Sequence, residues 1–155
     1  MKKIYPFIFI VFCFAAAGCG KDAFKRYERR IAGTWQLVDV DKRGIGGSLS
    51  HLPFVDGQFV FEEDGGMTWT STTGAVYNGS WDIRRRWVSD GCTTNADGNT
   101  VCNDRQVMSL SVTAVDFGVQ DVKTEYFDEM VFTGTDKFKA YVYSGWHRYV
   151  FHFRR

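Results

Sequence analysis

The four cysteines are the side chains of this 155-residue sequence that are best suited to covalent chemistry. Cys13 and Cys19 lie near the start of the sequence, and Cys92 and Cys102 lie in its second half. Disulfides persist in exported proteins, whereas thiols in the cytosol are kept reduced. The chemistry of these cysteines therefore depends on whether the chain is exported.

Residues 1–18 have the order of a secretory signal. Lys2 and Lys3 are followed by an apolar segment, residues 4–17, and then by small residues directly before Cys19. The apolar segment is shorter than the stretch of about 20 residues that crosses a bilayer as a helix. We therefore predict that residues 1–18 are removed, which leaves Cys92 and Cys102 to pair with each other as a disulfide.

The segment from Ala16 to Cys19 resembles the lipobox of bacterial lipoproteins. The resemblance implies cleavage before Cys19 and attachment of a lipid to its sulfur, so that the membrane is a partner through this residue. The alternative is an ordinary secretory signal with an incidental cysteine. Gly20 is not the Asp of inner-membrane retention, and Lys21-Asp22 resembles the export tag of surface lipoproteins of Bacteroidota. These residues imply an envelope protein at the outer membrane.

The sequence lacks the motifs of common catalytic sites. It contains no His-Glu-x-x-His, no Gly-x-Ser-x-Gly, no Cys-x-x-Cys and no glycine-rich phosphate loop. His147 and His152 lie at an odd spacing and should point to opposite faces of one strand, and His51 lies in a long loop. We interpret Glu62 to Asp64 as a solvated strand end and predict a protein that is not an enzyme and needs no cofactor.

Two charged or polar segments allow a second interpretation. Thr93 to Asp104 falls on the spacing of an EF-hand loop, but its first and last positions lack the usual Asp and Glu, so we predict no metal site. The run Arg84 to Arg86 is interpreted as a solvated face, with an anion or lipopolysaccharide contact as the alternative.

Length and charge limit the remaining functions. Loss of Lys2 and Lys3 would lower the basic residues from 19 to 17, against 18 acidic residues. Such a balance gives no field that attracts nucleic acid.

The length of the chain indicates a single domain. We expect a signal peptide (1–18), a lipidated tether (19–30) and one domain (31–155). The tether is expected to form a short helical turn over one end of the domain, and the alternative is a solvated linker.

Runs with a two-residue period, rich in aromatic and β-branched residues and separated by glycine-containing turns, predict eight antiparallel strands. An up-and-down barrel of eight strands is the predicted fold, because closure removes free edges. A β-sandwich is the alternative. The predicted strands are Thr34 to Asp41, Gly57 to Glu63, Met67 to Thr72, Val76 to Val88, Val101 to Val115, Thr124 to Thr133, Lys137 to Tyr143 and Trp146 to Arg154.

Alternation along the strands predicts which side chains face inward. If Cys92 faces Cys102, residues 96–98 form a tight turn, with Gly98 at positive φ. Continued toward the barrel, the same register would place the apolar Trp81 and Ile83 on one face with the polar Ser111 and Thr113. A one-residue shift of register corrects this, so we predict a β-bulge near Arg84 to Arg86. The predicted inward set is Trp35, Phe59, Phe61, Trp69, Trp81, Ile83, Leu110, Val112, Met130, Phe132, Phe138, Val142, Tyr149, Phe151 and Phe153.

Three segments resemble the lipocalin-like lipoproteins of Bacteroidota. They are Ile31 to Leu37 with its Gly-Thr-Trp triplet, Phe59 to Gly66, and Gly79 to Ile83. The resemblance implies an eight-stranded barrel in which Trp35 closes one end against an arginine of the last strand, Arg154 or Arg155. It does not imply an activity.

The sequence leaves two functions open. The first is a binding module for a small apolar or amphipathic ligand, which would enter under the loop from Lys42 to Asp56 and contact side chains such as Phe54, Phe61, Trp69, Trp81, Met130 and Tyr149. The loop would then be a lid, and otherwise a packed surface loop. The second is an interaction protein whose filled barrel carries loops that contact another envelope protein or a glycan.

Overall fold

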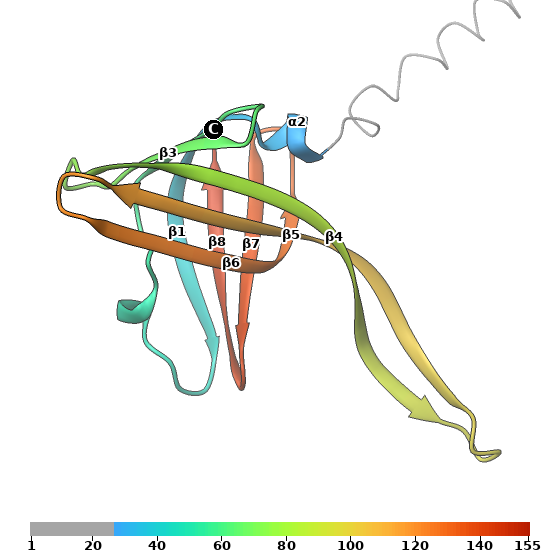
Figure 1. Ribbon diagram of the computed structural model, residues 1–155. Coiled ribbons are helices and arrows are strands. Elements are labelled where there is room, and N and C mark those ends of the chain that lie inside the picture. Colours follow the sequence, from blue (N-terminus) through green and yellow to red (C-terminus); the bar gives the residue numbers. More distant parts are fainter. Residues whose placement is uncertain (1–26) are drawn as a thin grey trace, which may run out of the picture.

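The computed structural model describes residues 27–155 and has an all-β fold. Eight antiparallel strands each pair with the next, and the last pairs with the first, so that the sheet closes into a barrel (Figure 1). The strands are β1 (Gly33–Gly44), β2 (Gln58–Phe61), β3 (Gly66–Thr70), β4 (Val76–Thr94), β5 (Thr100–Asp116), β6 (Asp121–Phe132), β7 (Lys137–Ser144) and β8 (His147–Arg154). The predicted barrel is therefore confirmed, and the β-sandwich alternative is not.

The predicted signal peptide, Cys19 and most of the tether lie outside the described residues. The described part of the tether forms a short helix, α2 (Tyr27–Ile31). None of the helices in residues 27–155 is long and apolar enough to span a membrane.

The barrel interior is filled by one continuous cluster of apolar side chains. The predicted inward set is buried except for Phe132 and Val142, which are half-buried and pack against the cluster. Many of the buried aromatic rings contact one another. Phe138 stacks on Phe153 at 4.3 Å between ring centroids, and Phe59 meets Phe153 edge-on at 5.4 Å.

The bulge in the β4–β5 hairpin lies farther along the chain than predicted. Arg84 to Arg86 pair regularly with β5, and the register shifts only between Ser89 and Cys92. Gly91 lies in this interval with φ of +137°, a conformation that side-chain-bearing residues rarely adopt. The predicted conflict between the cysteine register and the barrel register required a bulge between them but did not fix its position within that stretch.

A second bulge, in β6, was not predicted and reverses the faces of that strand. Leu110 pairs with Phe127 and Met108 pairs with Met130, so two residues of β6 lie opposite one residue of β5. Phe127 and Met130 are consequently both buried, and the two residues between them are only half-buried. The bulge thus removes Asp128 and Glu129 from the core and directs them toward the β4–β5 hairpin.

Trp35, α2 and the last residue close one end of the barrel. The indole N–H of Trp35 donates to the carbonyl of Ile31, and the Arg155 guanidinium lies over the Trp35 ring at 4.3 Å. The same guanidinium donates to the carbonyls of Arg30 and Ala32. Of the two arginines that the sequence left open, Arg155 therefore makes this contact.

Candidate functional site

Most of the residues predicted to touch a ligand lie in the core of the barrel. Phe54, Phe61 and Met130 are almost fully buried, and Trp81 donates its indole N–H to the carbonyl of Glu62 at 3.0 Å. These side chains pack against one another and against their neighbours. Trp69 and Tyr149 differ, because each also contacts the long loop after β1.

This loop plugs the barrel instead of lying free as a lid. The Phe54 ring inserts edge-on against Trp69 at 5.0 Å and Phe59 at 5.5 Å. The Trp69 indole donates to the carbonyl of Asp56 at 2.9 Å, and the Tyr149 hydroxyl donates to the carbonyl of Ser48 at 3.1 Å. A short 3-10 helix (Leu49–His51) lies between these anchor points. The packed-loop interpretation therefore holds in this structure.

A pocket of about 330 Å³ remains at the mouth beside this plug. Its walls come from the loop, including Leu52 and Val55, and from Trp69, Tyr77 and Lys123 of the strands. The Lys123 ammonium lies 5.5 Å from the Tyr77 ring and 3.3 Å from the Asp121 carboxylate. The pocket thus joins aromatic surface to a cation, and its polar groups lie at the rim.

The Tyr77 hydroxyl and the Asp121 carboxylate share a hydrogen bond of 2.8 Å at the same rim. This bond raises the pKa of Tyr77 and lowers the pKa of Asp121, since it favours the protonated phenol and the ionised carboxylate. Lys123 further lowers the pKa of Asp121. The rim therefore carries an ionised carboxylate and an ammonium group that neutralise each other.

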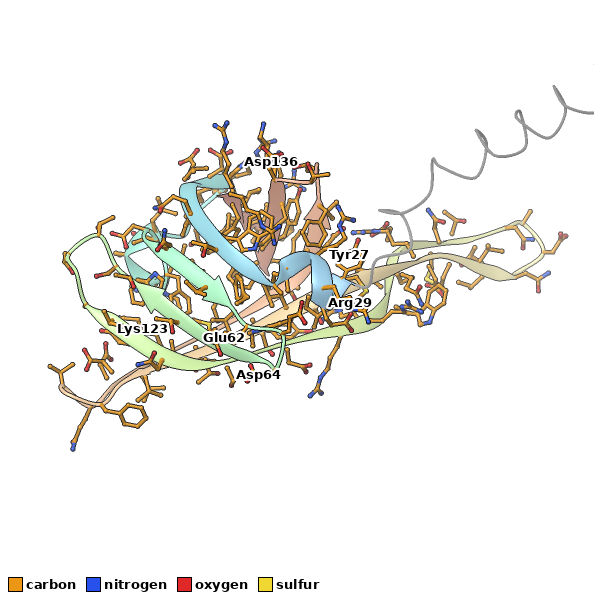
Figure 2. The ribbon with its side chains drawn as sticks, turned by 90° about the horizontal axis from the view of Figure 1, so that it is seen from above. Tyr27, Arg29, Glu62, Asp64, Lys123 and Asp136 are labelled. Carbon is orange, nitrogen blue, oxygen red and sulfur yellow. A yellow bond between two sulfur atoms is a disulfide. The ribbon has the colours of Figure 1, made fainter. Side chains whose placement is uncertain are left out.

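The β4–β5 hairpin continues well beyond the barrel. We call residues 87–106 the arm. Its two strands pair only with each other within the described part of the chain, because β3 pairs with β4 no farther than Ser80 and β6 pairs with β5 only from Met108. The arm projects from one side of the barrel, whereas the β5–β6 turn projects from the opposite side (Figures 1 and 2).

The tip of the arm is cross-linked. Cys92 and Cys102 form a disulfide, as predicted, and they face each other in the register of the hairpin. The turn is closed by hydrogen bonds of 3.0 Å between the Asn95 N–H and the Asn99 carbonyl and between the Gly98 N–H and the Asn95 carbonyl, and Gly98 has positive φ. The arm is thus held together at its far end without help from the barrel.

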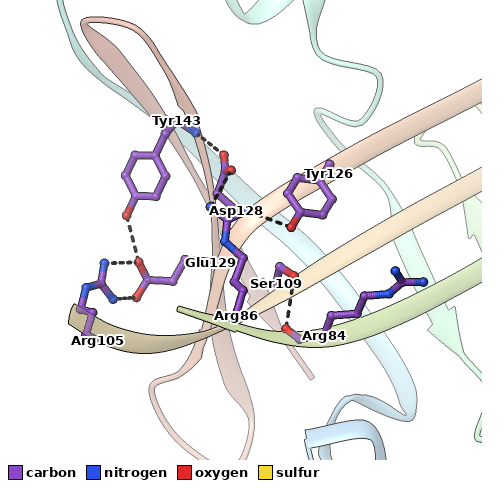
Figure 3. Close-up of polar contacts among 8 residues, drawn as sticks. All are labelled: Arg84, Arg86, Arg105, Ser109, Tyr126, Asp128, Glu129 and Tyr143. Atoms are coloured by element: carbon purple, nitrogen blue, oxygen red, sulfur yellow. Dashed lines mark hydrogen bonds and ion pairs between the residues drawn. The ribbon is translucent and has the colours of Figure 1, made fainter. Parts of the chain in front are cut away.

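Charged side chains fix the arm at its base (Figure 3). The Arg105 guanidinium donates to both oxygens of Glu129, at 2.6 and 2.8 Å, and the Tyr143 hydroxyl donates to Glu129 at 3.0 Å. Arg86 donates to the Tyr126 hydroxyl at 3.0 Å and lies 3.7 Å from Asp128. The β6 bulge supplies both carboxylates of this cluster.

These contacts shift the pKa values of the groups involved. The hydrogen bonds from Arg105 lower the pKa of Glu129, and those bonds raise the pKa of Arg105. Burial and the neighbouring Glu129 raise the pKa of Tyr143. Glu129 is consequently ionised and Tyr143 is protonated over the neutral pH range. The cluster holds the base of the arm as a set of fixed charges.

The histidines and the arginine run take part in local contacts. The His147 ring packs edge-on against Tyr149 at 5.1 Å, and His152 lies 3.2 Å from Asp41. Arg84 forms an ion pair with Asp82 at 2.6 Å. Within residues 27–155, no group of three or more His, Cys, Asp or Glu side chains is arranged to hold a metal ion.

The sequence predictions missed Lys123, Arg105 and Glu129. Each is a charged residue on a strand, and such residues are normally interpreted as solvated. For Lys123 the available signal was its spacing from Phe127, because residues 121, 123, 125 and 127 share one face of the strand and Phe127 is buried. Arg105 and Glu129 had no such signal, since Arg105 lies on another strand and Glu129 lies in the bulge. Burial raises the pKa of Glu125, in agreement with a partly enclosed position.

Comparison of the chain with protein-family models, with curated proteins and with solved structures found no match.

Proposed function

We propose that this protein is lipid-anchored through Cys19 in the bacterial cell envelope, at the outer membrane, and acts as an interaction protein without enzymatic activity. In this proposal the filled barrel is a rigid support, and the arm is the part that contacts another envelope protein. The lipobox-like segment supports the anchor, and the arm supports the contact.

The observation that carries this proposal is the extension of the arm beyond a filled barrel. An isolated two-stranded hairpin is at best marginally stable in water. This one has a disulfide at its tip and a bidentate Arg105–Glu129 pair at its base, and both the disulfide and Arg105 lie beyond the strand pairs that close the barrel. Stabilisation of a projecting element at both ends favours a role in which the arm itself is used.

The chemistry of the arm suits a protein surface. Trp87 is 70% exposed and Val101 is 64% exposed, and the arm also carries Asp90, Asp104 and Arg105. Tryptophan and arginine are enriched among the residues that dominate binding energy at protein interfaces. Both strands of the arm carry charged residues, Asp90 on β4 and Asp104 and Arg105 on β5, and β4 also has a bulge. These features oppose indiscriminate strand pairing. A specific protein partner is therefore favoured over aggregation of the arm.

Site-specific photo-crosslinking in intact cells tests this proposal. A photoreactive phenylalanine analogue at Trp87 should give one discrete higher-mass adduct, whereas the analogue at Val38, an exposed position on the barrel wall, should not. If position 87 gives no adduct, or if both positions give the same adducts, the arm is not a specific contact surface.

A second function is supported by the pocket at the mouth. Its volume of about 330 Å³ lies at the lower end of the range for small-ligand sites. Trp69 and Tyr77 offer apolar surface, and the Lys123–Asp121 ion pair offers polar partners at the rim, so the pocket suits an amphipathic molecule whose head group contacts Lys123. Fatty acids should quench tryptophan fluorescence in the wild type but not in Lys123→Met. Equal quenching in the two proteins would place the ligand elsewhere.

A further inference from the structure

The end of β1 and the β7–β8 hairpin bring two arginines together on one face of the sheet. Arg148 pairs directly with Arg43 on one side and with Tyr143 on the other. It lies on the face of β8 opposite to the buried Tyr149. Like charges directly across a strand pair are destabilising, so this placement requires an explanation.

The charge of this arginine pair is incompletely neutralised within the described part of the chain. Arg43 lies 3.8 Å from Asp41, which also pairs with His152. Among residues 27–155, no carboxylate lies within 4 Å of the Arg148 guanidinium. Glu129, whose pKa Arg148 helps to lower, already accepts hydrogen bonds from Arg105 and Tyr143 with its two oxygens. A positive site therefore remains at Arg148.

An open hollow of about 440 Å³ lies at the same place. Arg43, Arg148, Tyr143 and Trp146 are among the residues that line it. Trp146 is 92% exposed at the turn of the hairpin, so its ring is available for contact. The hollow thus combines two guanidinium groups with aromatic surface.

This combination defines a class of ligand. Guanidinium groups form paired hydrogen bonds with phosphate and carboxylate oxygens. A phosphate monoester carries a charge of about −1.5 to −2 and three terminal oxygens, and so can accept hydrogen bonds from both arginines and neutralise both. The exposed indole adds contact for the organic group of the ester. We propose that this hollow binds a small phosphate monoester with an apolar or ring-bearing organic group.

The position of the hollow favours a soluble ligand over a membrane surface. The β7–β8 turn lies at the end of the barrel opposite to α2, the helix that contains the end of the predicted lipidated tether (Figure 1). The hollow shares Tyr143 with the cluster at the base of the arm, but its lining includes no residue of the arm itself or of the mouth pocket. This inference therefore stands independently of the proposed function.

Titration of the purified protein with phenyl phosphate and with inorganic phosphate, followed by calorimetry and by the Trp146 indole N–H signal in NMR spectra, tests this site. Phenyl phosphate should bind more tightly than inorganic phosphate. Arg148→Gln should weaken binding at least about tenfold, as expected for loss of charge-assisted hydrogen bonds. Arg84→Gln is the matched control, because Arg84 is an exposed strand arginine with its own carboxylate partner, and it should change binding less than about twofold.

Trp146→Ala should weaken binding of phenyl phosphate while leaving that of inorganic phosphate unchanged. Equal losses in Arg148→Gln and Arg84→Gln would indicate attraction to overall charge and overturn the proposal. Absence of binding at about 10 mM ligand, a concentration above the Kd of roughly 1 mM that a weak site has, would do the same. Binding only to vesicles that contain phosphatidic acid would replace the small-molecule site by a membrane contact.

Discussion

Phe153 tests whether the interior of the barrel is a packed core. Its ring is almost fully buried, stacks on Phe138 at 4.3 Å, and contacts Phe59 and Phe127 at 5.4 and 6.4 Å. Truncation to alanine removes most of the contact area of one aromatic ring. At about 25 cal/mol per Å² and about 150 Å² of buried surface, the lost transfer free energy is about 4 kcal/mol. The free energy of unfolding should therefore fall by about 3–5 kcal/mol in Phe153→Ala, as in other buried aromatic truncations.

Thermal and denaturant unfolding measure this change. A loss of this size corresponds to roughly 10–20 °C in Tm for a domain of this length. Phe117→Ala is the matched control, since Phe117 is 79% exposed in the β5–β6 turn, and it should change the free energy of unfolding by less than about 0.5 kcal/mol. Benzene should raise the Tm of Phe153→Ala but not of the wild type, because a dry apolar cavity of aromatic size binds such molecules.

A small effect would refute the reasoning. If Phe153→Ala loses less than about 1 kcal/mol, the surrounding rings are not in tight contact and the barrel is hollow enough to relax without a cavity. Stabilisation of the wild type by benzene would lead to the same conclusion. Either result would argue against the filled barrel of the proposed interaction protein and favour ligand binding in the barrel interior.

Four further predictions concern the ends of the barrel, the arm and the anchor. In a Cys92→Ala/Cys102→Ala variant, the arm should lose about 2–3 kcal/mol of local stability, seen as faster amide exchange in residues 87–106 with core amides unchanged; equal exchange in the two proteins would contradict this. Glu129→Gln should lower the free energy of unfolding at pH 7 by about 1–2 kcal/mol, between the values of exposed and buried ion pairs. Because the pKa of Glu129 is lowered in the folded state, its contribution to the free energy of unfolding is complete above the ordinary pKa of about 4.3 and is lost as the pH falls through the folded pKa. In urea unfolding, the free energy of unfolding should therefore fall less on acidification in the variant than in the wild type. Arg155→Gln removes the contact with Trp35 and two hydrogen bonds and should cost about 1–2 kcal/mol in thermal unfolding, whereas Arg154→Gln should cost less than about 0.5 kcal/mol; similar losses would argue against the Trp35 contact. Cys19→Ser should abolish metabolic labelling with palmitate, and unchanged labelling would exclude lipid attachment at that residue.

The fold was predictable because the strands alternate strongly. Tyr149, Phe151 and Phe153 alternate along one strand, so that only one of its faces can point inward. Short glycine-containing turns then favour antiparallel pairing of strands that are neighbours in the sequence. Bulges interrupt this alternation and are hard to locate from composition. The β6 bulge is the clearest case, since a simple two-residue period cannot bury both Phe127 and Met130.

The candidate sites were harder to predict. Alternation identifies Phe61, Trp81 and Met130 as inward but does not distinguish a core from a ligand cavity, because both require apolar side chains. The arm has polar residues on both faces beyond Val88, so the predicted strand ended too early. The charged cluster at its base depends on partners distant in sequence, such as Arg105 and Glu129, which only the fold brings together.

The contact between Arg155 and the carbonyls of Arg30 and Ala32 places the two ends of the described chain side by side. Within residues 27–155, a loop connects each pair of neighbouring strands in the barrel except β1 and β8, which are joined by hydrogen bonds alone. The chain could therefore begin at another point of the ring without a change in the strand pairing. A circular permutant, with a short linker between residues 155 and 27 and new termini at Asp97 in the arm tip, would retain every strand pair of the barrel and the Cys92–Cys102 disulfide, and would open only the turn at the tip of the arm.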